Sequence, residues 1–159
     1  LFRALDGAGL ATPNHGRASD IVACPGLDYC NLANARSIPI AQAISTGLHE
    51  AGLDDATGDL TIKISGCINA CGHHHVANIG LLGVDKAGEE VYQLTLGGVG
   101  DGQAAIGKIL GPGLSADDAV TAVIACVRVY AEQAQPQESF IQTLNRLGTD
   151  PFKEAVYGA

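Results

Sequence analysis

Apolar residues recur at every second position in several short stretches of the chain. Leu60, Ile62 and Ile64 alternate with polar residues, which is the period of a strand with one buried face. A second alternation, which follows a turn at 85–90, predicts that two strands form a hairpin. In chain order, the predicted strands cover residues 20–23, 60–65, 78–84, 91–96 and 105–110.

A spacing of three and four residues between apolar positions marks the predicted helices. Ile40, Ile44 and Leu48 form one apolar row, within a helical stretch that is expected to begin at Cys30. Ser115 starts a sequence typical of a helix N-terminus, in which its side chain caps the first turn. In chain order, the predicted helices cover residues 2–10 (closed at Gly7 or Gly9), 30–53, 115–133, 140–147 and 150–157.

The composition indicates one folded domain over residues 1–159. Hydrophobic residues make up 47% of the chain and charged residues 16%, which argues against disorder. A domain of this size buries roughly two-thirds of the surface of its unfolded chain. The sequence contains no methionine and its first residues already follow a helical pattern, so we expect a C-terminal fragment of a longer protein.

The charge and hydropathy exclude two classes of partner. The net charge is −8 with nine lysines and arginines, which leaves no basic patch for nucleic acid. Apolar runs are short compared with the roughly 20 residues of a membrane span, and the first residues do not resemble a secretory signal. We therefore expect a cytoplasmic protein that binds neither nucleic acid nor membrane.

Thiols and imidazoles gather in residues 65–75 (SGCINACGHHH). Cys67 and Cys71 lie four residues apart, so a helical turn would place both sulfurs on one face. Cys24 and Cys30 supply a second pair, which completes a set of four soft ligands suited to an iron–sulfur cluster or zinc. The five-residue gap between Cys24 and Cys30 is loose for one tetrahedral zinc ion and favours a [4Fe–4S] cluster. The fifth cysteine, Cys126, is predicted to be a core residue.

Several short segments of the sequence resemble a known family. Segments 23–33 (ACPGLDYCNLA), 65–75 and 79–83 (IGLLG) together resemble the sirohaem and [4Fe–4S] domain of the nitrite and sulfite reductase family. Segment 92–98 (YQLTLGG) resembles its bacterial assimilatory branch. The resemblance implies an α+β fold with a mixed β-sheet of about five strands and flanking helices.

The resemblance also implies roles for individual residues. It implies that Cys24, Cys30, Cys67 and Cys71 hold the cluster, and that Cys71 also bridges to the sirohaem iron as its axial ligand. Three further residues would serve the cofactors. Asn69 would support a sulfur or the macrocycle, Gly72 would let the backbone approach, and His73 would touch the cofactor edge or relay protons. His74 and His75 are expected to point elsewhere, and we identify no catalytic residue in this chain.

The activity that the resemblance implies is the multi-electron reduction of sulfite to sulfide or of nitrite to ammonia. Electrons would come from a flavoprotein or ferredoxin. The family binds its anions with several Arg and Lys, which are expected in the N-terminal remainder of the enzyme. Arg36 and Lys63 flank the ligand loops and are interpreted as ordinary surface charges. This fragment alone is therefore expected to be inactive.

Two other functions remain open from the residues alone. The same four thiols would suit a stand-alone [4Fe–4S] electron-transfer module without haem. They would also suit a structural zinc-binding domain. The visible spectrum and the metal content distinguish these alternatives from the first.

Overall fold

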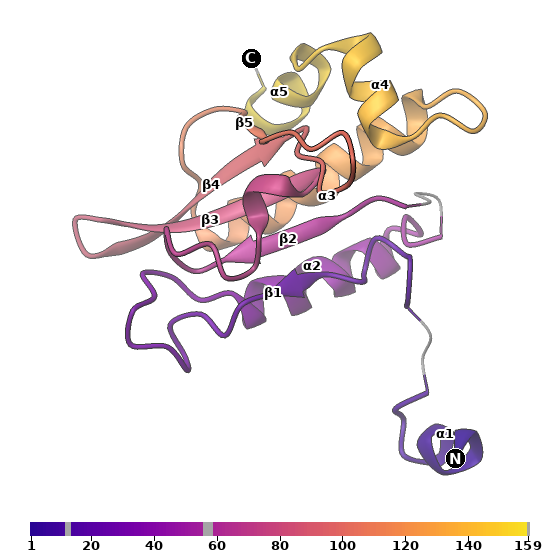
Figure 1. Ribbon diagram of the computed structural model, residues 1–159, viewed down its shortest axis with the longest axis vertical. Coiled ribbons are helices and arrows are strands. Elements are labelled where there is room, and N and C mark those ends of the chain that lie inside the picture. The colour runs from indigo at the N-terminus through magenta and orange to yellow at the C-terminus, as the bar shows by residue number, and fades with distance from the viewer. Residues whose placement is uncertain (12–13, 56–58, 159) are drawn as a thin grey trace.

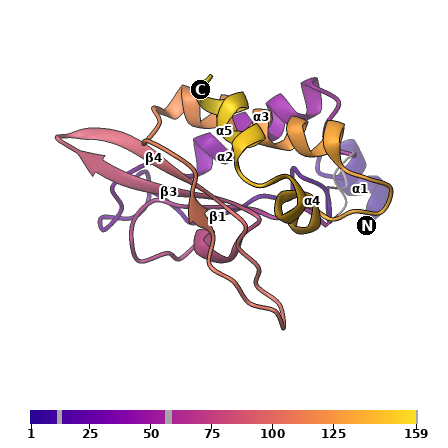
Figure 2. The ribbon, with the colours of Figure 1, turned by 90° about the horizontal axis from the view of Figure 1, so that it is seen from above.

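The computed structural model describes residues 1–11, 14–55 and 59–158, where a five-stranded sheet carries helices on one face (Figures 1 and 2). Among these residues, none of the helices has the length and apolar character that a membrane crossing requires. The elements are α1 (Phe2–Gly7), β1 (Val22–Ala23), α2 (Ile38–Glu50), β2 (Ile62–Ser65), the 3-10 helix η1 (His74–Val76), β3 (Ile79–Lys86), β4 (Glu89–Leu96), β5 (Lys108–Ile109), α3 (Ala116–Gln133), α4 (Phe140–Leu147) and α5 (Asp150–Tyr157).

The sheet is mixed, as predicted, and its strands lie in sequence order from β1 to β5. Strands β1, β2 and β3 are parallel, whereas β3, β4 and β5 are antiparallel. The carboxyl ends of parallel strands meet at one edge of a sheet. The segments that follow β1 and β2 therefore start side by side, next to the turn between β3 and β4.

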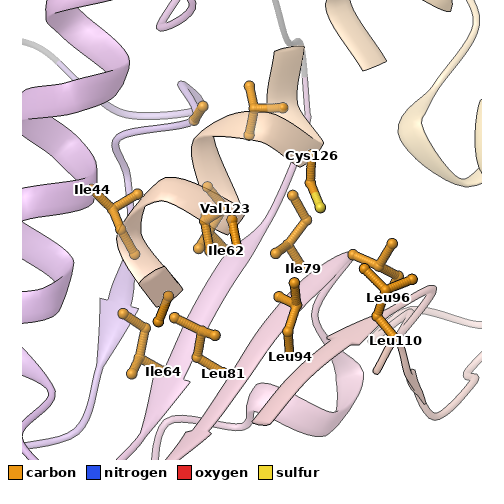
Figure 3. Close-up of a cluster of buried hydrophobic side chains, with 14 of the residues drawn as sticks. Ile44, Ile62, Ile64, Ile79, Leu81, Leu94, Leu96, Leu110, Val123 and Cys126 are labelled. Atoms are coloured by element: carbon orange, nitrogen blue, oxygen red, sulfur yellow. The ribbon is translucent and has the colours of Figure 1, made fainter. Parts of the chain in front are cut away.

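The core lies between the sheet and the helices α2 and α3 (Figure 3). Ile62 and Ile64 of β2 are buried on this face, which confirms the alternation in the sequence. Ile44 of α2 and Val123 of α3 pack over them from the helical layer. Burial of such side chains contributes about 1.5–3 kcal/mol each. This packing fixes β2, which precedes the Cys67 segment, against the helical layer.

The predicted helix at 30–53 is too long at its N-terminal end. Helix α2 begins at Ile38, and residues 31–36 form turns and bends instead. Pro39 explains the difference, because proline lacks an N–H and fits the first turn of a helix better than its interior. The chain from Cys30 to Arg36 is thus a loop.

The hairpin is longer than predicted and its turn is tighter. Ala87 and Gly88 form a two-residue turn in which φ is +58° and +88°. Positive φ at both positions is the signature of a type I′ turn, whose twist matches the flanking strands. The last strand is shorter than predicted, since β5 contains only Lys108–Ile109. Ala105 instead pairs with Val99 in an isolated bridge.

Helices α3, α4 and α5 agree with the sequence prediction to within a residue. The Ser115 side chain accepts a hydrogen bond from the Asp118 backbone N–H, as its capping position requires. Helix α1 ends at Gly7, has no buried residue, and stands away from the sheet (Figure 1).

Candidate iron–sulfur site

Two of the predicted ligands follow the ends of neighbouring strands. Cys24 comes directly after β1, and Cys67 lies two residues after β2. The Cys24 N–H donates to the Ile64 carbonyl at 3.1 Å, which continues the parallel pairing of the two strands. The Gly66 N–H donates to Cys24 Sγ at 3.1 Å. The Cys24 thiol therefore contacts Gly66, the residue directly before Cys67.

The loop that carries Cys30 folds back onto Gly66. The backbone N–H groups of Asn34 and Ala35 both donate to the Gly66 carbonyl, at 2.8 and 3.0 Å. Ser37, at the N-cap position of α2, makes no capping hydrogen bond with its side chain, and its Oγ instead lies 3.4 Å from Cys24 Sγ. The loop from Cys24 to Ser37 is thus anchored at both ends, and Cys30 lies half-buried between them.

Cys67 and Cys71 lie on turns and not on a helix. The Ala70 N–H donates to the Cys67 carbonyl at 3.1 Å, and the His73 N–H donates to the Ala70 carbonyl at 2.7 Å. Ala70 and His73 both have left-handed backbones, with φ of +55° and +54°. A right-handed helix cannot include them. The shared helical face that the spacing allowed is therefore not formed, and Cys67 is buried while Cys71 is exposed.

Gly72 holds this segment close to the sheet. Its N–H donates to Ser65 Oγ at 3.2 Å, and a Cβ built on Gly72 would lie 2.0 Å from the Ile64 carbonyl oxygen. The backbone at Gly72 therefore lies against β2, where no side chain fits. This contact within the chain requires glycine, whatever role Gly72 has toward a cofactor.

The three histidines have different surroundings. His73 is exposed, as is the nearby Asn69. His74 is only 7% exposed, and its Nδ1 has no hydrogen-bond partner among the described residues. Burial lowers the pKa of His74, and the adjacent His75 lowers it further. Nothing in the sequence distinguished His74 as the buried member of the run.

The four thiols suit an iron–sulfur cluster in their chemistry. All of them are free cysteines, and Cys24 Sγ already accepts a backbone N–H, a contact that tunes the potential of a cluster sulfur. Within residues 1–11, 14–55 and 59–158, no group of three or more His, Cys, Asp or Glu side chains is arranged to hold a single metal ion. The ligand set of Cys24, Cys30, Cys67 and Cys71 therefore stays a prediction.

Large apolar residues next to these thiols in the sequence are exposed. Tyr29 and Leu32, on either side of Cys30, are 80% and 71% exposed. Ile68, next to Cys67, is 79% exposed.

Cys126 lies apart from this site, as predicted. It is fully buried on α3 above the sheet (Figure 3). Burial raises the pKa of its thiol to about 12. A thiol that stays protonated is a poor metal ligand.

One group of contacts at the site was missed by sequence reasoning. Arg36, interpreted as an ordinary surface charge, is half-exposed but forms ion pairs with Asp28 and Glu90. Tyr92 donates to the Arg36 carbonyl at 2.7 Å. Glu90 and Tyr92 lie more than 50 residues after Arg36, and no motif links them. Lys63, the other cation of the region, is half-buried on β2.

Comparison with known proteins gives consistent results. Residues 17–158 match the family described as "Nitrite and sulphite reductase 4Fe-4S domain". The chain is 34% identical over 131 residues to a sulfite reductase [NADPH] hemoprotein beta-component of Methylobacterium nodulans, covering 80% of this chain and 21% of that protein. It is 30% identical over 164 residues to a sulfite reductase [ferredoxin] of Mycobacterium tuberculosis, covering 96% and 29%.

Solved structures share the fold. The structure of the Mycobacterium tuberculosis NirA protein superposes with a TM-score of 0.78 at 26% identity, covering 95% of this chain and 29% of that one. A dissimilatory sulfite reductase I structure gives a TM-score of 0.73 at 12% identity, covering 86% and 51%, and shows the fold alone. The chain thus spans between about a fifth and a third of the length of the two curated relatives described above.

Proposed function

Because this chain belongs to the nitrite and sulphite reductase 4Fe-4S domain family, we propose that it is the cluster- and sirohaem-binding module of a sulfite or nitrite reductase. Its enzyme would reduce sulfite to sulfide or nitrite to ammonia. The observation that carries the proposal is the placement of Cys24 and Cys67 at the ends of two adjacent parallel strands, joined through Gly66. Two ligand pairs far apart in the sequence thereby start from one rigid edge.

In this proposal, Cys24, Cys30, Cys67 and Cys71 hold a [4Fe–4S] cluster. Cys71 is the exposed member of the set, which supports the proposal that it would hold the sirohaem as well as the cluster. The cofactors, when bound, supply the electron storage that a multi-electron reduction needs. Asn69 and His73 are exposed near Cys71 and are proposed to contact the macrocycle, beside the backbone at Gly72.

The cations for an anionic substrate are proposed to come from another part of the enzyme. Arg17, Arg36 and Arg146 are each engaged by carboxylates of this chain. Sirohaem carboxylates and sulfite or nitrite need positively charged partners, and these three guanidinium groups are already paired with Asp or Glu. We therefore expect no turnover from this chain alone. The N-terminal remainder of the enzyme would supply the missing residues.

The proposed electron donor is a flavoprotein or a ferredoxin. The names of two relatives specify NADPH and ferredoxin as the reductants of those proteins. A cytoplasmic location is part of the proposal, because an exposed thiol such as Cys71 stays reduced in that compartment.

The visible spectrum of anaerobically reconstituted protein, read with its iron, sulfide and zinc content, tests the proposal. With iron and sulfide supplied, we expect a broad cluster absorption, and with sirohaem also supplied, a sharp haem band that stays with the protein on gel filtration. Cluster absorption without a retained haem band would favour the electron-transfer module. Stoichiometric zinc without iron or sulfide would favour the structural zinc domain.

A further inference from the structure

Four side chains tie the loop of the first cysteine pair to the end of the β3–β4 hairpin. We call Asp28, Arg36, Glu90 and Tyr92 the hairpin clamp. Glu90 lies one residue after the start of β4, and Arg36 lies just before the N-cap residue of α2. Figure 1 shows the cysteine loop and the hairpin at the same end of the sheet. The clamp joins elements that are 54 residues apart in the sequence.

Glu90 is the centre of the hairpin clamp. Its Oε2 accepts the Arg36 backbone N–H at 2.9 Å, and its Oε1 pairs with Arg36 Nη1. The Tyr92 hydroxyl lies 3.2 Å from the same Oε2 and donates to the Arg36 carbonyl at 2.7 Å. One carboxylate therefore engages both the backbone N–H and the guanidinium of Arg36, and charge-assisted hydrogen bonds of this kind are the stronger ones. The single phenol proton of Tyr92 goes to the Arg36 carbonyl, the shorter of its two contacts.

The clamp reaches the thiols through the same loop. Arg36 Nε donates to Asp28 Oδ1 at 3.1 Å, and Asp28 lies between Cys24 and Cys30 in the chain. The residue after Arg36 is Ser37, whose Oγ lies 3.4 Å from Cys24 Sγ. A shift of Arg36 would move both the middle and the end of the ligand loop.

The Glu90 and Tyr92 end of the clamp is shielded from solvent, whereas the Arg36 side chain is half-exposed. Tyr92 is fully buried, and Glu90 has a side chain only 23% exposed. Burial and the Glu90 charge raise the pKa of Tyr92 above its usual range, so the phenol stays a donor.

We propose that Glu90 is a positioning residue that, through Arg36 and Tyr92, holds Cys24 and Cys30 in the geometry that receives the cluster. The inference rests on the proposed function for the identity of the group that the thiols bind. Its structural part concerns only the placement of this loop in the protein. That part can be measured before any cluster is bound.

The test compares alkylation of individual cysteines in the reduced, metal-free chain. Glu90→Gln keeps the shape of the side chain and removes its charge, and Tyr92→Phe removes one hydroxyl. Iodoacetamide labelling, read by peptide mass spectrometry, should be about fivefold faster at Cys24 and Cys30 in Glu90→Gln, as expected for loss of a charge-assisted hydrogen bond. Tyr92→Phe should act in the same direction. Glu89→Gln, in the exposed neighbouring position, is the matched control and should leave the rates unchanged.

Two internal reporters separate positioning from general loss of structure. Cys71 lies on another loop and Cys126 in the core, so their labelling rates should stay as in the wild type. If Cys24 and Cys30 were labelled at the same rates in Glu90→Gln as in Glu89→Gln, the proposal would be overturned. A parallel rise at Cys126 in both Glu90→Gln and Tyr92→Phe would overturn it too, because the effect would then be global.

A second arm examines the reconstituted protein. If the proposed function is right, the Glu90→Gln cluster should be lost to an iron chelator about fivefold faster than that of Glu89→Gln. A wild-type chain that takes up no iron and sulfide would contradict the proposed function and leave the labelling result intact. A cluster retained equally in both variants would contradict the positioning role alone.

Discussion

Gly72 links the fold to the candidate site at the scale of a single residue. It lies between the exposed thiol of Cys71 and the run of histidines, and its backbone rests against the Ile64 carbonyl. The sequence placed a glycine beside the ligands and suggested close approach to a cofactor. The structure supplies a more direct reason for a glycine at this position, which is the close packing of this segment on β2.

Gly72→Ala should therefore destabilise the metal-free protein. The new Cβ would lie 2.0 Å from a backbone oxygen that cannot move without breaking the sheet. We expect a loss of about 2 kcal/mol or more in the free energy of unfolding, at the upper part of the range for overpacking. Urea denaturation followed by circular dichroism measures it. Gly102→Ala is the control, because a Cβ at Gly102 meets nothing within 4 Å. Similar stabilities for the two variants would refute this packing role.

Individual residues also mark the limit of what sequence could predict. Cys126 was predicted to be a core residue because it lies far in the sequence from the other four cysteines and has no partner there, and its burial confirms this. The burial of His74 could not be predicted, since it depends on the left-handed turn at His73. Glu90 looked like one of several hairpin carboxylates until the packing of the Arg36 loop was known.

At the scale of elements, the connection between α3 and α4 is fixed by one carboxylate. Glu138 accepts hydrogen bonds from Arg146 Nη2 at 2.6 Å, from the Gln135 N–H at 2.9 Å and from Thr143 Oγ1 at 3.0 Å. These donors, Arg146 first, lower the pKa of Glu138 to about 2. The turn at 134–139 is therefore held by a charge.

This turn should weaken in acid. The pKa of Glu138 is lower in the folded than in the unfolded protein, so its contribution is complete above the usual glutamate pKa of 4.5 and is lost as the pH falls toward 2. Glu138→Gln lacks the contribution at all pH values. Its denaturation midpoint should fall less steeply than that of the wild type between pH 4.5 and pH 2. Glu132→Gln, on the exposed side of α3, should keep the wild-type slope. Parallel profiles for Glu138→Gln and the wild type would contradict the assignment.

Element types followed from the sequence better than their ends did. The alternation in 60–65 and the apolar spacing in 115–133 reflect burial on one face, which the sheet and α3 confirm. The start of α2 depends on Pro39 in its first turn, and the hairpin ends depend on the turn at Ala87 and Gly88. Such boundaries are set by local backbone chemistry and not by the apolar period.

At the scale of the whole molecule, topology brings one cysteine of each pair to the same edge of the sheet. Cys24 and Cys67 are separated by α2 and its connections, and the parallel pairing of β1 with β2 places them at one edge. The sequence identified the thiols by their chemistry and spacing. The predicted strands at 20–23 and 60–65 already ended beside Cys24 and Cys67, which the structure confirms. The sequence did not reveal that these two strands pair, or which contacts anchor the loops. The α+β fold was implied by resemblance, and the structure confirms it.

The iron and sulfide content of single Cys→Ser variants tests the account most directly. Each chain is reconstituted anaerobically and analysed after gel filtration. The wild type and Cys126→Ser should each retain about four iron and four sulfide per chain, whereas Cys24→Ser, Cys30→Ser, Cys67→Ser and Cys71→Ser should each lose most of both. Wild-type content in two or more of those four variants, with loss in Cys126→Ser, would contradict the proposed ligand set.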